Sequence, residues 1–211
     1  MSVFSITHHK CGSVVAVWKI EETEDELRRQ CAVPQSELEE MSYISNPQRR
    51  LERLAVRVLL NNVLGEKVYL GYHDNGRPFL LNNVANISIT HTRQFAAIIY
   101  HPTFDVGIDM ESLSRNFDAV ETRALSDDER DYLSGKHRHA QLCLIWCAKE
   151  ALCKRLSEPG LDFAAQIHIE KFTPKKKGKL AATYTDSDGA QTEFTPHYTI
   201  VEDHAMVWVA M

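Results

Sequence analysis

One segment of the chain is apolar on almost every side when it is drawn as a helix, and it constrains the fold more than any other feature. Residues 142–154 read LCLIWCAKEALCK, within a helix predicted from about 136 to 156. Such a helix must be covered by other elements on most of its faces. A chain of 211 residues can bury roughly 70% of the surface of its unfolded form, so we expect a core that needs no disulfide or metal.

The predicted elements alternate between helices and groups of short strands. A long helix is expected to begin at Asn46 and Pro47, because asparagine caps helix N-termini and proline suits the first turn. We predict an α+β fold with two similar halves, 1–102 and 103–211, each a small, mostly antiparallel sheet packed on a long helix. The further predicted elements are a helix at 23–29, a helix after the capping residue Ser126, turns at 74–76 and 82–83, and strands at 12–20, 85–90, 95–101, 106–111, 166–170, 179–184, 193–200 and 205–210.

The charge balance excludes one class of partner. The chain has 24 Lys and Arg against 29 Asp and Glu, a formal net charge of −5. Proteins that coat nucleic acids usually carry excess basic residues, so we expect no nucleic-acid partner. A local basic pocket for one anionic ligand remains compatible with this charge. The lysine-rich run 171–179 is interpreted as a solvated hairpin turn, with nucleic-acid binding as the alternative.

Hydropathy and cysteine content indicate the compartment. The longest apolar runs, such as 95–100, are far shorter than the roughly 20 residues of a membrane span. The first ten residues lack the pattern of a signal peptide. The five cysteines include no CxxC pair, which favours small buried thiols over a zinc site. We expect a cytoplasmic protein with no membrane partner.

Two acidic residues on one predicted strand are candidate metal ligands. In 106–111, VGIDME, side chains alternate between faces, so Asp109 and Glu111 share one face about 7 Å apart at their Cα atoms. Their repulsion would be relieved by a cation, and oxygen ligands suit Mg²⁺ or Mn²⁺. The alternative is an exposed strand end with two solvated acids.

The apolar helix carries three charged residues, Lys149, Glu150 and Lys154. Charges are rarely buried unpaired, and Glu150 and Lys154 are four residues apart, so a structural ion pair is one interpretation. If Glu150 instead faces the strand with Asp109 and Glu111, three carboxylates and one lysine converge on one cation. That combination suits phosphoryl-type chemistry, in which a carboxylate takes a proton and a lysine stabilises the leaving group.

Two motifs resemble a known family. GIDME at 107–111 and WCAKEALCK at 146–154 closely resemble the two signature motifs of the 4′-phosphopantetheinyl transferase superfamily. Three upstream segments extend the resemblance, which covers about half of the chain, roughly residues 45 to 157. The length favours the pseudodimeric, monomeric type that activates surfactin synthetase over the short trimeric holo-acyl-carrier-protein synthases. The upstream segments are NGRP at 75–78, ISITHT at 87–92, and the basic helix at 49–57.

The resemblance implies roles for individual residues. Asp109, Glu111 and Glu150 would hold Mg²⁺ together with the pyrophosphate of coenzyme A. Glu150, directly or through a water, would deprotonate a carrier-protein serine, and Lys154 would stabilise the charge that develops on the pyrophosphate. Contacts to the phosphates of coenzyme A, bound at the junction of the two halves, are expected from Arg77, Thr90, His91 and either Arg49 or Arg50.

Other interpretations of these upstream residues remain open. Thr90, which replaces the family's usual serine, and His91 could form a capped turn. The arginines of the basic helix could form a solvated face, and Lys149 is a further candidate cation for the phosphates. The arginines concerned are Arg49, Arg50, Arg53 and Arg57.

The expected function is Mg²⁺-dependent transfer of the 4′-phosphopantetheine group of coenzyme A to a serine of an apo acyl or peptidyl carrier protein, releasing adenosine 3′,5′-bisphosphate. One alternative is a divalent-metal phosphohydrolase that acts on a small anion without any carrier protein. Another is a non-catalytic module that binds coenzyme A or a carrier protein. The pathway that the carrier serves is left open by the sequence.

Overall fold

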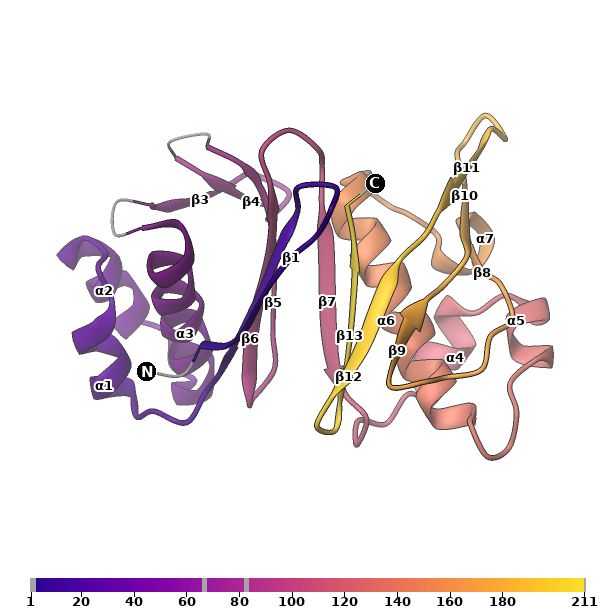
Figure 1. Ribbon diagram of the computed structural model, residues 1–211, viewed down its shortest axis with the longest axis horizontal. Helices are drawn as coiled ribbons and strands as arrows, with labels where there is room; N and C mark the ends of the chain where they lie inside the picture. The colour runs from indigo at the N-terminus through magenta and orange to yellow at the C-terminus, as the bar shows by residue number, and fades with distance from the viewer. Residues whose placement is uncertain (1–2, 66–67, 82–83, 211) are drawn as a thin grey trace. The chain divides into compact units, whose positions relative to one another are not determined.

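The computed structural model describes residues 3–65, 68–81 and 84–210. The chain forms two compact units that divide between Phe104 and Asp105, near the predicted boundary at 102 (Figure 1). The predicted turn at 82–83 lies outside the described residues, whereas the turn at 74–76 joins two short strands.

The first unit packs a long helix on an antiparallel sheet. The helix α3 (Pro47–Leu64) begins as predicted, because the Asn46 side chain accepts hydrogen bonds from the backbone N–H groups of residues 48 and 49. Its sheet has the strand order β1-β2-β6-β5, and β3 and β4 form a separate hairpin. The remaining elements of this unit are β1 (Val3–His8), β2 (Val14–Lys19), α1 (Glu24–Gln30), α2 (Gln35–Ser42), β3 (Leu70–Tyr72), β4 (Pro78–Leu80), β5 (Asn86–His91) and β6 (Phe95–His101).

The second unit contains two antiparallel sheets and the long helix α6 (Arg138–Leu156). One sheet has the order β7-β13-β12-β9 and the other β11-β10-β8. The remaining elements are β7 (Gly107–Ser112), α4 (Asp118–Ala124), α5 (Asp127–Asp131), α7 (Phe163–Gln166), β8 (Ile167–Ile169), β9 (Lys177–Lys179), β10 (Ala182–Thr185), β11 (Gln191–Phe194), β12 (His197–Val201) and β13 (His204–Val209).

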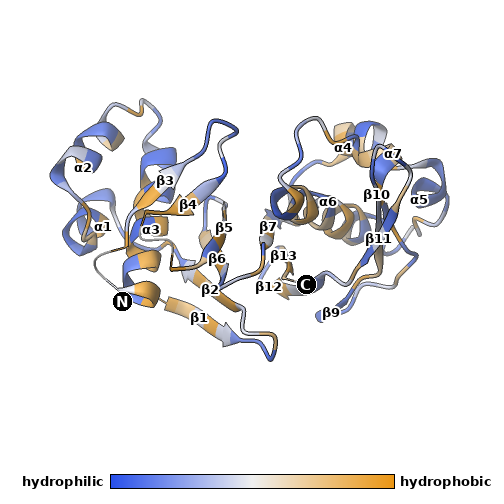
Figure 2. Cartoon of the chain, turned by 90° about the horizontal axis from the view of Figure 1, so that it is seen from above, coloured by the Kyte–Doolittle hydropathy of each residue, from blue (hydrophilic) through white to orange (hydrophobic). Residues whose placement is uncertain are grey.

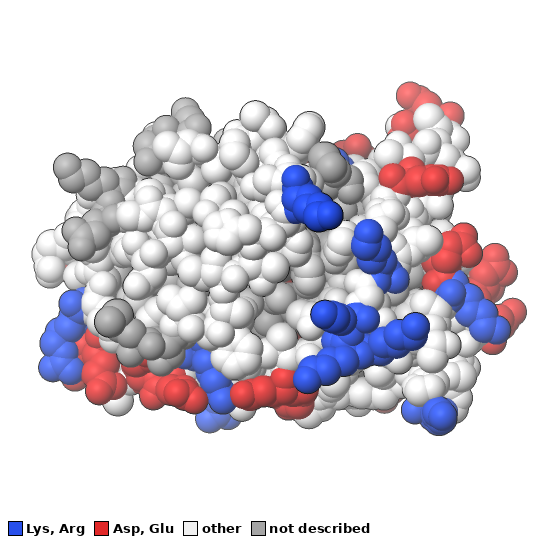
Figure 3. Space-filling view, viewed as in Figure 1, with Lys and Arg blue, Asp and Glu red and all other residues white. Residues whose placement is uncertain are grey.

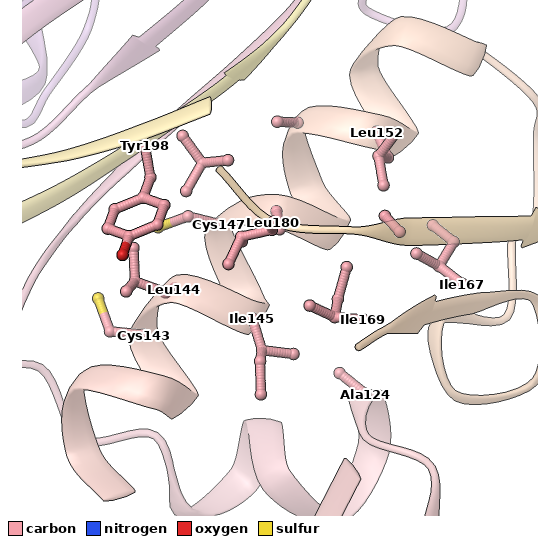
Figure 4. Close-up of a cluster of buried hydrophobic side chains, with 14 of the residues drawn as sticks. Ala124, Cys143, Leu144, Ile145, Cys147, Leu152, Ile167, Ile169, Leu180 and Tyr198 are labelled. Atoms are coloured by element: carbon pink, nitrogen blue, oxygen red, sulfur yellow. The ribbon is translucent and has the colours of Figure 1, made fainter. Parts of the chain in front are cut away.

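The helix α6 lies at the centre of the second unit's core, as its apolar sequence predicts. Figure 2 shows α6 largely in the hydrophobic colour, in contrast to α5. Its buried side chains pack against β8 and β12 in the cluster of Figure 4. Cys143 and Cys147 are buried in this cluster as free thiols, as predicted, whereas Cys11, Cys31 and Cys153 are free thiols that are only partly buried. The α+β fold with small antiparallel sheets is therefore confirmed.

Two predicted strands are each divided in the structure. The segment predicted as one strand at 179–184 ends β9 and begins β10, which belong to different sheets. Between them the Leu180 N–H donates to the Pro196 carbonyl, a residue that likewise separates β11 from β12. Alternation of side chains does not reveal such a change of sheet, because both strands keep the same period.

The lysine-rich run is solvated, as predicted, but it is not a hairpin turn. It connects β8 to β9, which lie in different sheets, and Lys177 and Lys179 pair with β12. The five lysine side chains of the run are exposed. Figure 3 shows Lys and Arg side chains grouped over this part of the second unit.

Candidate active site

A close contact between β7 and α6 places the two predicted motifs side by side. A Cβ atom at Gly107 would lie 1.8 Å from the carbonyl oxygen of Ala151, so only glycine allows the strand to approach the helix this closely. Gly107 begins the strand that carries Asp109, and Ala151 follows Glu150 in the helix. The glycine of the first motif therefore serves to bring its acids toward the helix of the second.

Asp109 is buried and paired with Lys154. One carboxylate oxygen, Oδ1, accepts a hydrogen bond from Lys154 Nζ at 2.7 Å. The same ammonium group donates to the Ile108 carbonyl at 3.0 Å. Lys154 of α6 therefore forms a partly buried ion pair with a residue of β7. Its contacts are not limited to those within its own helix.

Glu111 is half-buried and has two donors. Arg115 forms an ion pair with its carboxylate, and the Trp146 indole donates a hydrogen bond to it. Burial raises the pKa of Glu111, and the negative charge of Asp109 raises it further, against the opposing effect of Arg115. The two strand acids therefore repel each other, as their spacing predicts.

Glu150 lies within the electrostatic field of the same acids. Its pKa is raised first by burial and then by the charges of Asp109 and Glu111, while Lys154 and Arg115 act in the opposite direction. A carboxyl group that is desolvated and close to other acids is harder to ionise, and once ionised it is a stronger base. The three carboxylates thus act on one another electrostatically.

The donor chemistry of this group suits a hard divalent cation, because all three side chains offer carboxylate oxygens and their mutual repulsion disfavours ionisation. As the side chains stand, however, no three His, Cys, Asp or Glu residues within 3–65, 68–81 and 84–210 are grouped so that they could hold a metal ion. Lys154 and Arg115 contact Asp109 and Glu111 instead.

Lys149, a candidate cation for the phosphates, has a structural role in this fold. Its side chain is 0% exposed and its Nζ lies 2.6 Å from Glu129 Oε2. The same ammonium group donates hydrogen bonds to two backbone carbonyls. Glu129 in turn accepts from the Ile169 N–H at 2.8 Å. The pair joins α5, α6 and β8, so the structure corrects the assignment of Lys149 to a ligand-binding group.

In the first unit, Thr90 and His91 end β5, the last strand in the sheet order β1-β2-β6-β5. Thr90 is buried, whereas the His91 ring is 42% exposed and its Nδ1 lies 2.9 Å from Glu52 Oε2. Gln48 donates to the other oxygen of Glu52 at 3.0 Å. The His91 imidazole is therefore oriented by Glu52, a residue of α3.

The basic helix α3 uses its arginines unequally. Arg50 donates to Glu24 and to the Ile44 carbonyl, at 3.0 Å and 2.6 Å. Arg57 is buried against Glu37. Arg49 and Arg53 are exposed, so the prediction of a solvated face holds for these two and fails for the other pair, whose guanidinium groups stabilise the packing of α1 and α2. Arg77 follows the turn between β3 and β4.

Three contacts made by residues of the motifs were not anticipated from the sequence. Arg115, Glu52 and Glu129 each contact a residue of the motifs. Arg115 is four residues after Glu111, but it lies in a turn after a strand, so helical spacing gives no signal for the contact. Glu52 and Glu129 reach their partners across 39 and 20 residues of chain (91 − 52 and 149 − 129), which no local pattern encodes.

Comparison with known protein families gives a match in the second unit. No curated protein matches this chain. No helix of the described residues is long and apolar enough to cross a membrane. Residues 105–209, which include every strand and helix of the second unit, match the family model of the 4′-phosphopantetheinyl transferase superfamily, and the match supports a transferase that moves phosphopantetheine to carrier proteins.

Proposed function

We propose that this chain transfers the 4′-phosphopantetheine group of coenzyme A to a serine of an apo acyl or peptidyl carrier protein, in a Mg²⁺-dependent reaction that releases adenosine 3′,5′-bisphosphate. The observation that carries the proposal is the mutual interaction of Asp109, Glu111 and Glu150, with Lys154 paired to the first of them. These residues fall within the segment that matches the superfamily.

Glu150 is the proposed general base. Its raised pKa makes the ionised carboxylate a better proton acceptor than a solvated glutamate, and it is only half-buried, so a serine hydroxyl or a water can reach it. The proton of the carrier serine would move to Glu150 as the serine oxygen attacks the phosphorus atom bonded to the pantetheine arm. The bond from that phosphorus to the bridging oxygen would break, and adenosine 3′,5′-bisphosphate would leave.

Asp109, Glu111 and Glu150 are the residues that would hold Mg²⁺, with Mn²⁺ as a possible substitute, and the bound ion would supply positive charge to the pyrophosphate oxygens. Lys154 is already oriented by two hydrogen bonds, to Asp109 and to the backbone of β7. A preoriented ammonium group of this kind would stabilise the charge that develops on the leaving phosphate.

Contacts to the nucleotide phosphates are proposed for Arg49, Arg77, Thr90 and His91. The exposure of Arg49 and the engagement of Arg50 with Glu24 favour Arg49 for the 3′-phosphate. His91, held by Glu52, is oriented for a charge-assisted hydrogen bond to a phosphate oxygen. We also propose that the protein is a cytoplasmic monomer of the pseudodimeric type that activates surfactin synthetase.

The test is a mass measurement on a carrier protein. The chain is incubated with coenzyme A, Mg²⁺ and several apo carrier proteins, and transfer adds one phosphopantetheinyl group to the carrier. Glu150→Gln should abolish the gain, while Glu193→Gln, which neutralises an exposed glutamate of the same unit, should retain it.

Each alternative function predicts a different result in the same assay. A phosphohydrolase would consume coenzyme A without modifying any carrier, and a binding module would consume nothing. If none of the carriers tested is modified, the proposed transferase activity is refuted.

A further inference from the structure

Arg115 is the least expected residue near the acids, and its position is fixed by its surroundings. It follows β7, and its backbone N–H donates to the Ser112 carbonyl at 3.1 Å, which turns the chain back toward the strand. Its guanidinium group then reaches Glu111, four residues earlier. The guanidinium carbon lies 5.4 Å from the ring centre of Phe117 and 5.6 Å from that of Trp146.

The two rings are themselves held in place. Phe117 is almost fully buried, and Trp146 packs against Phe163 with ring centres 5.8 Å apart. The indole of Trp146 also donates to Glu111. The guanidinium therefore has two aromatic contacts and one carboxylate contact, a setting in which cation–π attraction adds to the ion pair. A charged side chain that is 41% exposed would otherwise gain little from such a pair.

The charge of Arg115 acts on more than its direct partner. It lowers the pKa of Glu111 and also that of Glu150, which is on the other element of the proposed metal site. A divalent cation bound by these acids would act on the same carboxylates with the same sign. A guanidinium and a divalent metal ion on the same carboxylate repel each other, so each weakens the binding of the other.

We propose that Arg115 is a resident counter-cation for Glu111 that competes with the divalent metal and is displaced from this carboxylate when the metal binds. This inference rests on the proposed function, because it assumes that Glu111 is a metal ligand. The aromatic rings of Phe117 and Trp146 provide a surface along which the guanidinium can move while remaining in contact. Arg115 would thereby set the metal affinity below the value that the carboxylates alone would give.

The first test measures metal affinity without substrate. The full chain is titrated with Mg²⁺, and in parallel with Mn²⁺, by calorimetry in the absence of coenzyme A. Arg115→Gln is expected to bind metal about threefold to tenfold more tightly than the wild type, because a competing positive charge is removed. Arg115→Lys, which keeps the charge, should lie closer to the wild type, and Arg123→Gln, which removes an exposed arginine of the same unit, should match the wild type.

The second test detects the movement of the guanidinium. Metal binding should change the fluorescence of Trp146, because the cation next to its ring is displaced. This part of the signal should be absent in Arg115→Gln and in Trp146→Phe, which assigns it against the other two tryptophans, Trp18 and Trp208. A binding isotherm for Arg115→Gln that is equal to or weaker than that of the wild type, in a variant with an unchanged circular dichroism spectrum, would overturn the inference.

The outcomes separate this inference from the proposed function. If the wild type binds metal and modifies a carrier, but Arg115→Gln binds metal no more tightly, only the role of Arg115 is refuted. If the folded wild type binds metal neither alone nor in the presence of coenzyme A, the metal site and the role of Arg115 are both refuted.

Discussion

Lys149 Nζ and Glu129 Oε2 lie 2.6 Å apart, and neither side chain is exposed to solvent. The lysine ammonium group also donates hydrogen bonds to the carbonyls of Ala124 and Phe163, both at 2.8 Å. One lysine of the second motif is thus satisfied inside the fold, whereas Lys154, five residues later, points to the acids of β7. The motif therefore places a fully buried lysine and a partly exposed lysine, each paired with an acid, on the same helix.

Breaking this buried pair should lower the free energy of unfolding. Lys149→Met leaves Glu129 buried without its counter-charge, so the free energy of unfolding should fall by about 3–5 kcal/mol in urea denaturation. The double variant with Glu129→Gln should lose less than the sum of the two single losses. Lys176→Met, an exposed lysine in the same unit, should change stability by less than about 0.5 kcal/mol. Equal losses in the two lysine variants would contradict the structural role.

Gly107→Ala tests the approach of β7 to α6. A methyl group at this position would overlap the Ala151 carbonyl, a backbone atom that cannot rotate away. We expect a loss of about 3 kcal/mol in the free energy of unfolding, measured in urea, together with loss of transfer. Gly135→Ala is the matched control, since nothing lies within 4 Å of its added Cβ atom, and it should fold as the wild type does.

Lys154→Met should slow transfer without unfolding the protein. Lys154 is partly exposed, and its removal breaks only the ion pair with Asp109. The main effect should therefore be a lower rate of the chemical step. Removal of one preoriented charge at a leaving group lowers the rate by roughly 100- to 1,000-fold. Single-turnover kinetics at saturating coenzyme A would measure this. Lys171→Met, an exposed lysine, should keep the wild-type rate, and a similar rate for Lys154→Met would exclude its role in the reaction.

The rate of transfer should depend on the ionisation of Glu150. Burial and then the neighbouring acids raise its pKa above the ordinary value of 4.5 in the metal-free protein. At a metal concentration well below saturation, where ionisation of the free enzyme governs the rate, transfer should therefore decline on the acid side at a pH higher than a solvated glutamate would give. Transfer rates measured across this pH range at fixed metal and coenzyme A concentrations would locate the decline. Loss of rate only below pH 4.5 would show that Glu150 is not the group that must be ionised.

The raised pKa of Glu150 also makes the stability of the metal-free protein depend on pH. A carboxyl whose pKa is higher in the folded state binds more protons there than in the unfolded chain, so stability falls as pH rises from about 4.5 through the folded pKa. The glutamine side chain of the Glu150→Gln variant does not ionise, so this variant should not lose stability in the same way. In EDTA, the variant should therefore be more stable than the wild type at pH 7, with the difference shrinking toward pH 4. Urea denaturation at the two pH values would check this, and a variant that is less stable at pH 7 would refute it.

Much of the fold could be predicted because its signals are local. The cap of α3 at Asn46 and that of α5 at Ser126 form as expected, since each depends on a side chain reaching a backbone N–H within three residues. The short helix α2 was not predicted, because it starts after Pro34 with no side-chain cap and buries only Met41. The exposed edge strand β1 was also missed, since it is defined by pairing with β2.

By itself, the sequence determined the residue types and their local placement: carboxylates on one face of a strand, and charges within an apolar helix. Only the tertiary structure decided which of these charges meet. It paired Lys154 with Asp109, Lys149 with Glu129, and Arg115 with Glu111. The physical reason is that desolvation forces each partly or fully buried charge to find a partner, while the choice of partner depends on which backbones approach closely, as β7 and α6 do at Gly107.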